Sequence, residues 1–247
     1  MVAARRWARA TWTVLTAFVV ESIVFGLAVL PAALFWEWHL TWRFPGEWAR
    51  VVALAMAFVP AYLLFAVALM LFSAAATWLL GWRTPADAEM RIRDLEWPLL
   101  DWVRYTVLTH VARVFAGTIL RATPVWTMYL RLNGARIGRG VYVNTLGASD
   151  HNLLEFGAGT VVGSDVHIAG HTVEGGVVKT RAVRVGRNVT IGVGSVVMLG
   201  AEIGDGCDVG ALSFVPKRAR LDAGVAYAGS PVRPIGPQGG SGGALRS

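Results

Sequence analysis

The sequence contains little cysteine, lysine or charge. Its single cysteine, Cys207, excludes an internal disulfide framework and any zinc site built from several cysteines. Lys179 and Lys217 are the only lysines, so the net charge of +7 comes almost wholly from arginine. Charged residues make up 16% of the 247 and hydrophobic residues 55%, which is too apolar for an ordinary soluble domain. There is no basic-aromatic motif for nucleic acid, and an anionic membrane surface explains the basic balance more simply.

Charge is scarcest in two long N-terminal segments. Residues from about Thr11 to Phe35 form an apolar run broken only by Glu21, and residues 51–80 carry no formal charge. A helix needs about 20 apolar residues to cross a bilayer, so both segments are long enough. Tryptophans border both segments, as interfacial anchors do: Trp7, Trp12, Trp36, Trp48, Trp78 and Trp82. We predict two transmembrane helices within residues 1–96. A cleaved signal peptide is the alternative for the first, but Glu21 and the second span disfavour it.

Arginines flank the two predicted spans and set their orientation. They lie before the first span and after the second, which predicts a multi-pass cell-membrane protein with both ends in the cytoplasm: Arg5, Arg6, Arg9, Arg83, Arg91 and Arg93. Residues 97–133 are apolar with charges spaced through them, a mixture typical of amphipathic helices at a membrane interface. A third full span there would bury His110 and Arg113 at high cost.

From Val185 to Val215 an aliphatic residue recurs at every sixth position. The series is Val185, Ile191, Val197, Ile203, Val209 and Val215, and four of the six are followed by glycine. A period of six fits neither a helix nor a single strand, but it fits short strands and tight turns stacked as a parallel β-helix. The repeat begins near Ile137 and is interrupted at residues 144–155 and 171–184. We predict a β-helix domain over residues 134–236 and a disordered, glycine-rich tail over 237–247.

These aliphatic-glycine hexads, with a small residue at the fifth place and a closing Gly-Ser-Pro-Val-Arg segment at 229–233, resemble the hexapeptide-repeat acyltransferase superfamily. The resemblance covers about Gly134 to Ile235. A second resemblance, which begins at Ala122-Thr123-Pro124 and continues to Lys179, is to the membrane-embedded terminal region of nonribosomal peptide synthetases such as polylysine synthase. Together they imply N-terminal transmembrane α-helices followed by a C-terminal left-handed parallel β-helix of hexapeptide repeats.

The acyltransferase resemblance implies one histidine as general base, which takes a proton from an acceptor hydroxyl or amine during attack on an acyl-CoA thioester. His171 is the first candidate, because it follows Ile168 at an outward-facing place where the larger interruption begins. His167 also points outward and is its rival. Asp150, His151 and Glu155 lie in the other interruption and are expected to bind the acceptor or to orient the base. A solvated loop is the alternative for these three.

The same resemblance places coenzyme A along a groove between coils. It points to Gly192, Gly194, Gly210, Ala211 and Ser213, with Lys217 and Arg233 as partners for phosphate. Tight turns require glycines regardless of any ligand, so the glycines have a purely structural alternative. The family also implies a homotrimer with sites between subunits, and no metal.

The sequence therefore predicts a membrane-anchored acyltransferase that moves an acyl group, with acetyl favoured, from acyl-CoA to a membrane-associated, peptide-like or sugar-like acceptor. A carrier-protein thioester is an alternative donor. One alternative function is a non-catalytic trimeric membrane scaffold. Another is a metalloenzyme like the γ-class carbonic anhydrases, which share the β-helix but need three histidines around zinc.

Overall fold

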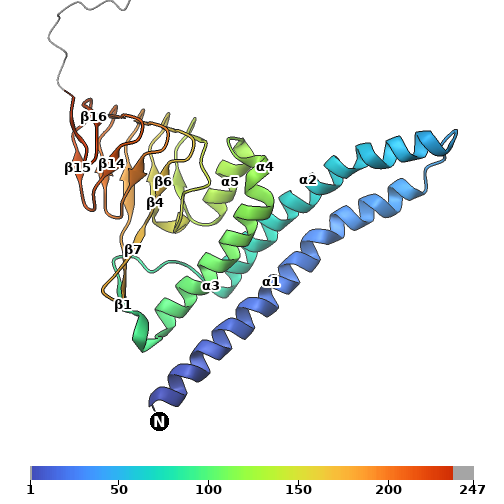
Figure 1. Cartoon of the computed structure of the whole chain (residues 1–247), viewed down its shortest axis with the longest axis horizontal. Coiled ribbons are helices and arrows are strands. Elements are labelled where there is room, and N and C mark those ends of the chain that lie inside the picture. Colours follow the sequence, from blue (N-terminus) through green and yellow to red (C-terminus); the bar gives the residue numbers. More distant parts are fainter. Residues whose placement is uncertain (1, 236–247) are drawn as a thin grey trace, which may run out of the picture.

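Two long helices form the N-terminal third of the chain. In the computed structural model, which describes residues 2–235, α1 (Val2–Leu40) and α2 (Glu47–Leu80) lie side by side as a hairpin (Figure 1). Both continue through an internal proline, Pro31 and Pro60 respectively. By length and composition both could cross a membrane, and only 11% and 22% of their most apolar windows is buried. Their apolar side chains are therefore mostly left uncovered by the rest of the chain.

A group of shorter helices joins this hairpin to the C-terminal half. In order, the elements are β1 (Glu89–Arg91), η1 (Ile92–Asp94), α3 (Trp97–Ala112), the π-helical turn η2 (Arg113–Gly117), α4 (Thr118–Leu120) and α5 (Pro124–Leu132). Thr123 caps α5 by accepting a hydrogen bond from the Trp126 amide, and Pro124 occupies the first turn. Helix α5 contacts α2 on one side and the first strands of the C-terminal half on the other.

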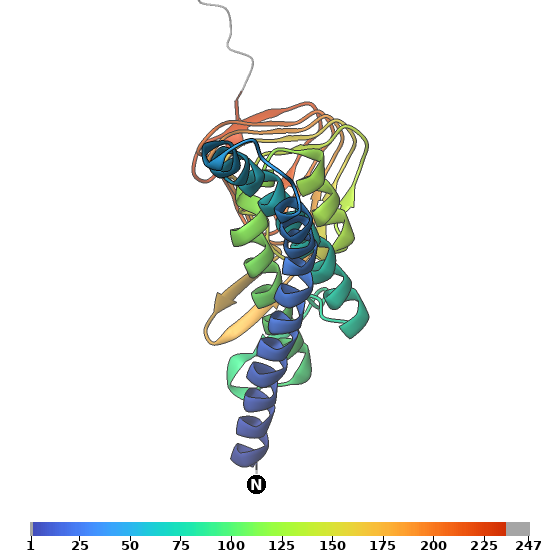
Figure 2. The ribbon, with the colours of Figure 1, turned by 90° about the vertical axis from the view of Figure 1, so that its right-hand side faces the viewer.

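The C-terminal half is a prism of short parallel strands. Three sheets form its faces, and successive strands generally pass from one face to the next (Figures 1 and 2). Sheet 1 contains β2 (Arg136–Ile137), β4 (Leu154–Phe156), β9 (Val183–Val185), β12 (Glu202–Ile203) and β15 (Arg220–Leu221). Sheet 2 contains β3 (Tyr142–Val143), β5 (Val161–Val162), β10 (Thr190–Ile191), β13 (Asp208–Val209), β16 (Ala226–Ala228) and the antiparallel β17 (Arg233–Pro234). Sheet 3 contains β6 (His167–Ile168), β11 (Val196–Val197) and β14 (Phe214–Val215).

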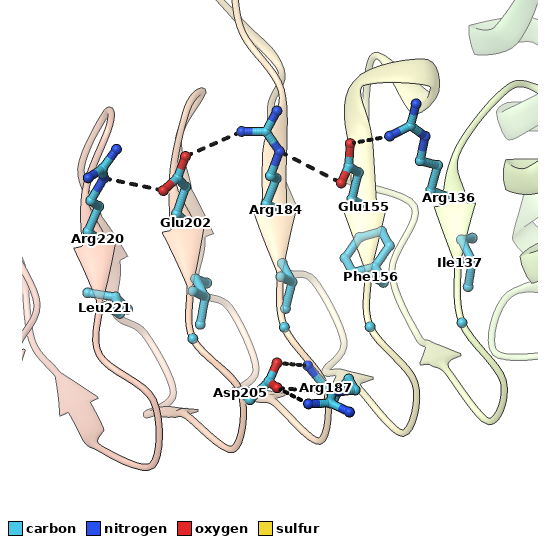
Figure 3. A pocket seen from close by; sticks show the side chains of 16 residues that line it. Arg136, Ile137, Glu155, Phe156, Arg184, Arg187, Glu202, Asp205, Arg220 and Leu221 are labelled. Carbon is cyan, nitrogen blue, oxygen red and sulfur yellow. Dashed lines mark hydrogen bonds and ion pairs between the residues drawn. The ribbon is translucent and has the colours of Figure 1, made fainter.

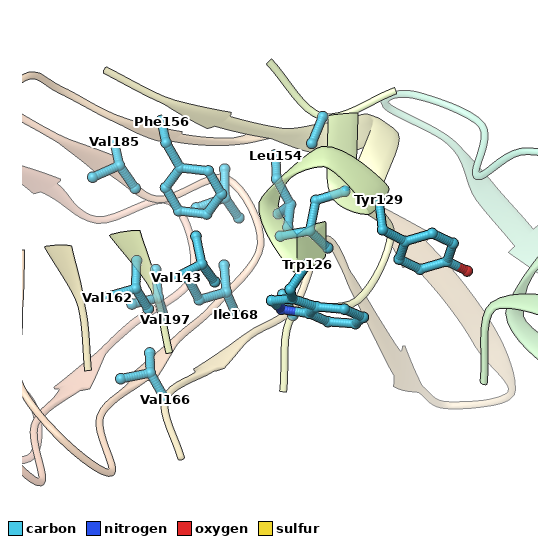
Figure 4. Close-up of a cluster of buried hydrophobic side chains, with 14 of the residues drawn as sticks. Trp126, Tyr129, Val143, Leu154, Phe156, Val162, Val166, Ile168, Val185 and Val197 are labelled. Atoms are coloured by element: carbon cyan, nitrogen blue, oxygen red, sulfur yellow. The ribbon is translucent and has the colours of Figure 1, made fainter. Parts of the chain in front are cut away.

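The six-residue period accounts for this prism. Thr190 pairs with Asp208, and Glu202 pairs with Arg220, so three hexads complete one coil. All six aliphatic residues between Val185 and Val215 are buried inside, as the period predicts. At Gly192 a Cβ atom would lie only 2.4 Å from the Ala211 nitrogen of the next coil, so the stacking of the coils itself requires glycine there. Trp126 and Tyr129 of α5 extend the apolar core at the start of the prism (Figure 4).

The two interruptions of the repeat are ordered. The first contains a bridge between Ala148 and Ile168 and the turn η3 (His151–Leu153), and it ends where β4 begins. The second is an antiparallel hairpin of β7 (His171–Glu174) and β8 (Val177–Thr180), to which β1 adds a third strand. The second interruption is therefore an inserted hairpin with its own strand pairing. The predicted tail at 237–247 lies outside the described residues.

Candidate active site

Both interruptions lie on the same corner of the prism, where the chain passes from sheet 3 to sheet 1. Ala148 and Ile168 pair on the sheet 3 side, and the paired strands β4 and β9 follow on the sheet 1 side. The two segments therefore occupy successive coils, one above the other. A Cβ atom at Gly170 would lie 3.0 Å from the Asp150 Cβ, so the first interruption packs directly against the start of the second.

This stacking brings Asp150 to His171. The Nδ1 atom of His171 lies 2.5 Å from Oδ2 of Asp150. The Asp150 side chain is 1% exposed, whereas that of His171 is 26% exposed. A carboxylate only accepts hydrogen bonds, so in the neutral ring Nδ1 carries the proton and Nε2 keeps its lone pair. The arrangement orients a partly exposed imidazole, which lies beside the indole of Trp102.

Asp150 is held by more than His171. Its Oδ1 accepts hydrogen bonds from Thr84 Oγ1 at 2.8 Å and from Trp102 Nε1 at 3.1 Å. Its Oδ2 also accepts one from Ser149 Oγ at 3.1 Å. Burial acts to raise the pKa of Asp150, but the hydrogen bonds, first that from His171, outweigh it and lower this pKa. In turn, the hydrogen bond to Asp150 raises the pKa of His171 above its ordinary value, against the opposing effect of burial.

Thr84 and Trp102 were not predicted from the sequence. Thr84 belongs to the connector after α2, and Trp102 belongs to α3. Both lie far from Asp150 in sequence, and neither occurs in a motif. Only the docking of the helices against the prism brings them to the carboxylate.

His151 neighbours Asp150 in sequence but points elsewhere. Its side chain is enclosed by the rings of Tyr105, Trp126 and Tyr129, and its Nε2 lies 3.2 Å from the Ala148 carbonyl oxygen. Burial lowers the pKa of His151 to about 4, which leaves the ring neutral. A small cavity of about 50 Å³ lies beside it. His151 is therefore buried, and it does not lie at the exposed position that the predicted contact with an acceptor would need.

Glu155 lies in β4 and not in an irregular segment, which corrects its predicted location. Its carboxylate pairs with Arg136 at 3.1 Å and with Arg184 at 3.7 Å. It belongs to a row of alternating charges on the outer face of sheet 1 (Figure 3): Arg136, Glu155, Arg184, Glu202 and Arg220. The row lines a groove of about 770 Å³. Each of the two glutamates in this row lies between two arginines and pairs with both.

His167 does not share the surroundings of His171. It lies exposed on β6, and it lines a separate cavity of about 430 Å³ together with Arg113 and Arg121. Within residues 2–235 its ring has no carboxylate partner, in contrast to His171. The structure thus gives only one of the two rival histidines an orienting carboxylate.

The residues predicted to bind coenzyme A fall on three parts of the prism. Five follow β10 and β13 at the corner between sheets 2 and 3: Gly192, Gly194, Gly210, Ala211 and Ser213. Ser213 is buried there, and its Oγ accepts a hydrogen bond from the Gly229 amide. Lys217 lies on the corner between sheets 3 and 1, where it pairs with Glu174 of the hairpin. Arg233 lies in β17. One chain does not bring these residues together.

A zinc site of three histidines does not form around these residues. His151 is buried, while His167 and His171 lie in different surroundings. Across residues 2–235, no group of three or more histidine, cysteine, aspartate or glutamate side chains is placed to hold a metal ion.

Comparison with known proteins found no matching family model. The chain is 27% identical over 176 residues to a delta-poly-L-ornithine synthetase from Acinetobacter baumannii, which is 70% of this chain but only 13% of that protein. Among solved structures, it is similar to serine acetyltransferase from Neisseria gonorrhoeae (14% identity, 90% of this chain, 73% of that chain, TM-score 0.41). It is also similar to a hexapeptide-repeat acetyltransferase from Vibrio cholerae complexed with acetyl coenzyme A (19% identity, 41% of this chain, 59% of that chain, TM-score 0.38). The chain therefore spans only a small part of the synthetase that its sequence matches.

Proposed function

We propose that this protein is a membrane-anchored member of the hexapeptide-repeat acyltransferases that moves an acyl group from acyl-CoA to a hydroxyl or amine. The observation that carries the proposal is the hydrogen bond between buried Asp150 and partly exposed His171. A carboxylate that fixes the tautomer of a histidine prepares Nε2 to accept a proton. We also propose that the coil is left-handed and that acetyl-CoA is the acyl donor.

In the proposed reaction, Nε2 of His171 takes the proton of the acceptor hydroxyl or amine as the acceptor attacks the thioester carbonyl. The tetrahedral intermediate then collapses, the carbon–sulfur bond breaks, and the thiolate of coenzyme A takes the proton back from Nε2. The acyl group ends on the acceptor, and His171 regains its starting form. Asp150 stabilises the imidazolium between the two transfers, consistent with the raised pKa of His171.

A homotrimer is part of the proposal. The five predicted coenzyme A residues at the corner between sheets 2 and 3 lie on a different corner from His171 within one chain. A symmetric trimer would allow this corner of one copy to face the Asp150–His171 pair of the next. Lys217 lies on the same corner as His171 and could meet a phosphate of coenzyme A if it leaves Glu174.

Membrane anchoring is supported by the uncovered apolar surface of α1 and α2. Because of the flanking arginines, we place the prism on the cytoplasmic side of the membrane. Acyl-CoA is available on that side. The acceptor is then membrane-associated or hydrophobic. A carrier-protein thioester is a second donor to test.

The test measures the release of coenzyme A thiol by the full chain in detergent micelles, with acetyl-CoA and a panel of amine and hydroxyl acceptors. Cys207 is fully buried, so it should give little background with a thiol reagent. We expect turnover by the wild type and by Arg220→Gln, an exposed control, but none by His171→Ala. A folded wild type that releases no thiol with any acceptor or donor would refute the enzyme and favour the scaffold.

A further inference from the structure

The cavity beside His167 lies where the short helices meet the first coils of the prism. It measures about 430 Å³, and its lining includes Arg113 of η2, Arg121 after α4, Leu146, Asp165 and His167. It is separate from the Asp150–His171 pair, and the proposed reaction does not use it. Single turns of π-helix such as η2 occur frequently at functional sites.

The cavity carries a net positive charge. Two guanidinium groups face one carboxylate, that of Asp165, which is 3.5 Å from Arg121 and 76% exposed. Arg113 donates hydrogen bonds to Nδ1 of His110 at 2.6 Å and to the Leu146 carbonyl at 3.4 Å. Neither partner is a carboxylate, so these contacts orient its guanidinium without cancelling its charge. Arginine forks match the geometry of phosphate oxygens, and the imidazole of His167 adds an N–H donor.

The cavity also adjoins an exposed apolar surface. This surface consists of Val114, Phe115, Ile119, Val125 and Met128, each between 39% and 51% exposed. It continues onto the membrane helices, because the Phe115 ring lies 5.3 Å from that of Phe25 in α1. Tyr62 of α2 donates a hydrogen bond to the Phe115 carbonyl at 2.6 Å. A bilayer that surrounds α1 and α2 would therefore also touch η2 and α4.

We propose that this cavity binds the phosphate of an anionic phospholipid head group, with the acyl chains along the exposed apolar residues of η2, α4 and α5. The inference rests on the proposed membrane anchoring and not on the acyl transfer. Arg113, Arg121 and His167 would hold the phosphate oxygens, and basic residues beside a leaflet attract anionic lipid. A bound head group would fix how the prism sits against the membrane.

The test is native mass spectrometry of the full chain released from micelles that contain phosphatidylglycerol or phosphatidylcholine. We expect the wild type to retain phosphatidylglycerol preferentially. Arg121→Gln and, separately, His167→Asn should weaken its affinity for that lipid about tenfold, the effect of one charge-assisted hydrogen bond. Arg220→Gln, an equal loss of charge on the outer face of sheet 1, should leave retention unchanged. Arg121 and Asp165 are exposed, so we expect the first variant to fold.

Equal retention of phosphatidylglycerol by the wild type and both variants would overturn the proposal. So would binding of inorganic phosphate at this cavity without lipid retention, because the site would then serve a soluble phosphate. Failure of the anchoring is recognised separately, as wild-type protein that leaves the membrane fraction without detergent. Failure of acyl transfer appears only in the release of coenzyme A thiol.

Discussion

Replacing Asp150 by asparagine tests the proposed base most sharply, because it keeps the shape of the side chain and removes its charge. Oδ1 of Asp150 now accepts from Thr84 and Trp102, and Oδ2 accepts from His171 and Ser149. An asparagine has one oxygen and one NH₂ group for these two places. The hydroxyl of Thr84 can rotate to accept, but the indole N–H of Trp102 can only donate. The oxygen should therefore face Trp102, and the NH₂ group should face His171.

An NH₂ group beside Nδ1 of His171 reverses the tautomer. Nδ1 must then accept a hydrogen bond, and Nε2 carries the proton, so the ring presents no lone pair to the acceptor. General base catalysis contributes about 10²–10⁴-fold, so we expect kcat to fall about 10³-fold, or about 4 kcal/mol in the activation barrier. The exchange of charged for neutral hydrogen bonds should also cost about 1–3 kcal/mol of stability.

The assay is thiol release across a pH series. In the proposed reaction neutral His171 is the active form. Asp150 raises the pKa of His171, so wild-type kcat/KM should rise with pH through this raised value. In Asp150→Asn the pKa of His171 falls, so the acid limb should move to lower pH while the plateau drops. A variant that melts cooperatively, keeps kcat within threefold of wild type and shows an unmoved acid limb would refute the role of the pair.

Three further substitutions probe one partner of Asp150 and two contacts that stabilise the prism. Trp102→Phe removes the N–H donated to Asp150 but keeps an aromatic ring; kcat should fall about tenfold with KM for acetyl-CoA unchanged, and an equal change in both would indicate a general structural effect. Gly192→Ala forces a Cβ atom to 2.4 Å from the next coil, so thermal melting should show a loss of about 1–3 kcal/mol; no loss would mean that the coils separate easily. Trp126→Phe leaves the buried Thr145 carbonyl without its 2.9 Å donor and should also cost about 1–3 kcal/mol in denaturant unfolding, with an unchanged midpoint as the contrary result.

The prism was predictable because the same six-residue pattern recurs along its strands and turns. Each aliphatic position between Val185 and Val215 faces the interior, and a turn after each strand needs a small residue, so the period alone predicts the coil. The interruptions were visible as failures of that period. The hairpin in the second one also has a local signal: Gly175-Gly176, between Glu174 and Val177, is typical of a two-residue hairpin turn.

The partners of Asp150 were not predictable from spacing. Thr84 lies 66 residues before it and Trp102 lies 48 residues before it, so no local pattern connects them. Glu155 was misplaced because the first interruption ends at Leu153, two residues earlier than predicted, and the chain rejoins sheet 1 at Leu154. The sequence shows where the repeat loses its register. The residue at which the repeat resumes depends on how the intervening residues pack.

The origin of these partners explains why the helices and the prism belong to one chain. The Asp150 carboxylate accepts from the connector after α2, from α3 and from the hairpin that carries His171. Three segments that are distant in sequence therefore donate hydrogen bonds to one buried carboxylate. Each hydrogen bond offsets part of the free energy cost of burying its charge. If the helices shift against the prism, Thr84 and Trp102 leave the carboxylate, and its hold on the His171 tautomer weakens. The orientation of the proposed base is thus coupled to how α2, its connector and α3 dock against the prism.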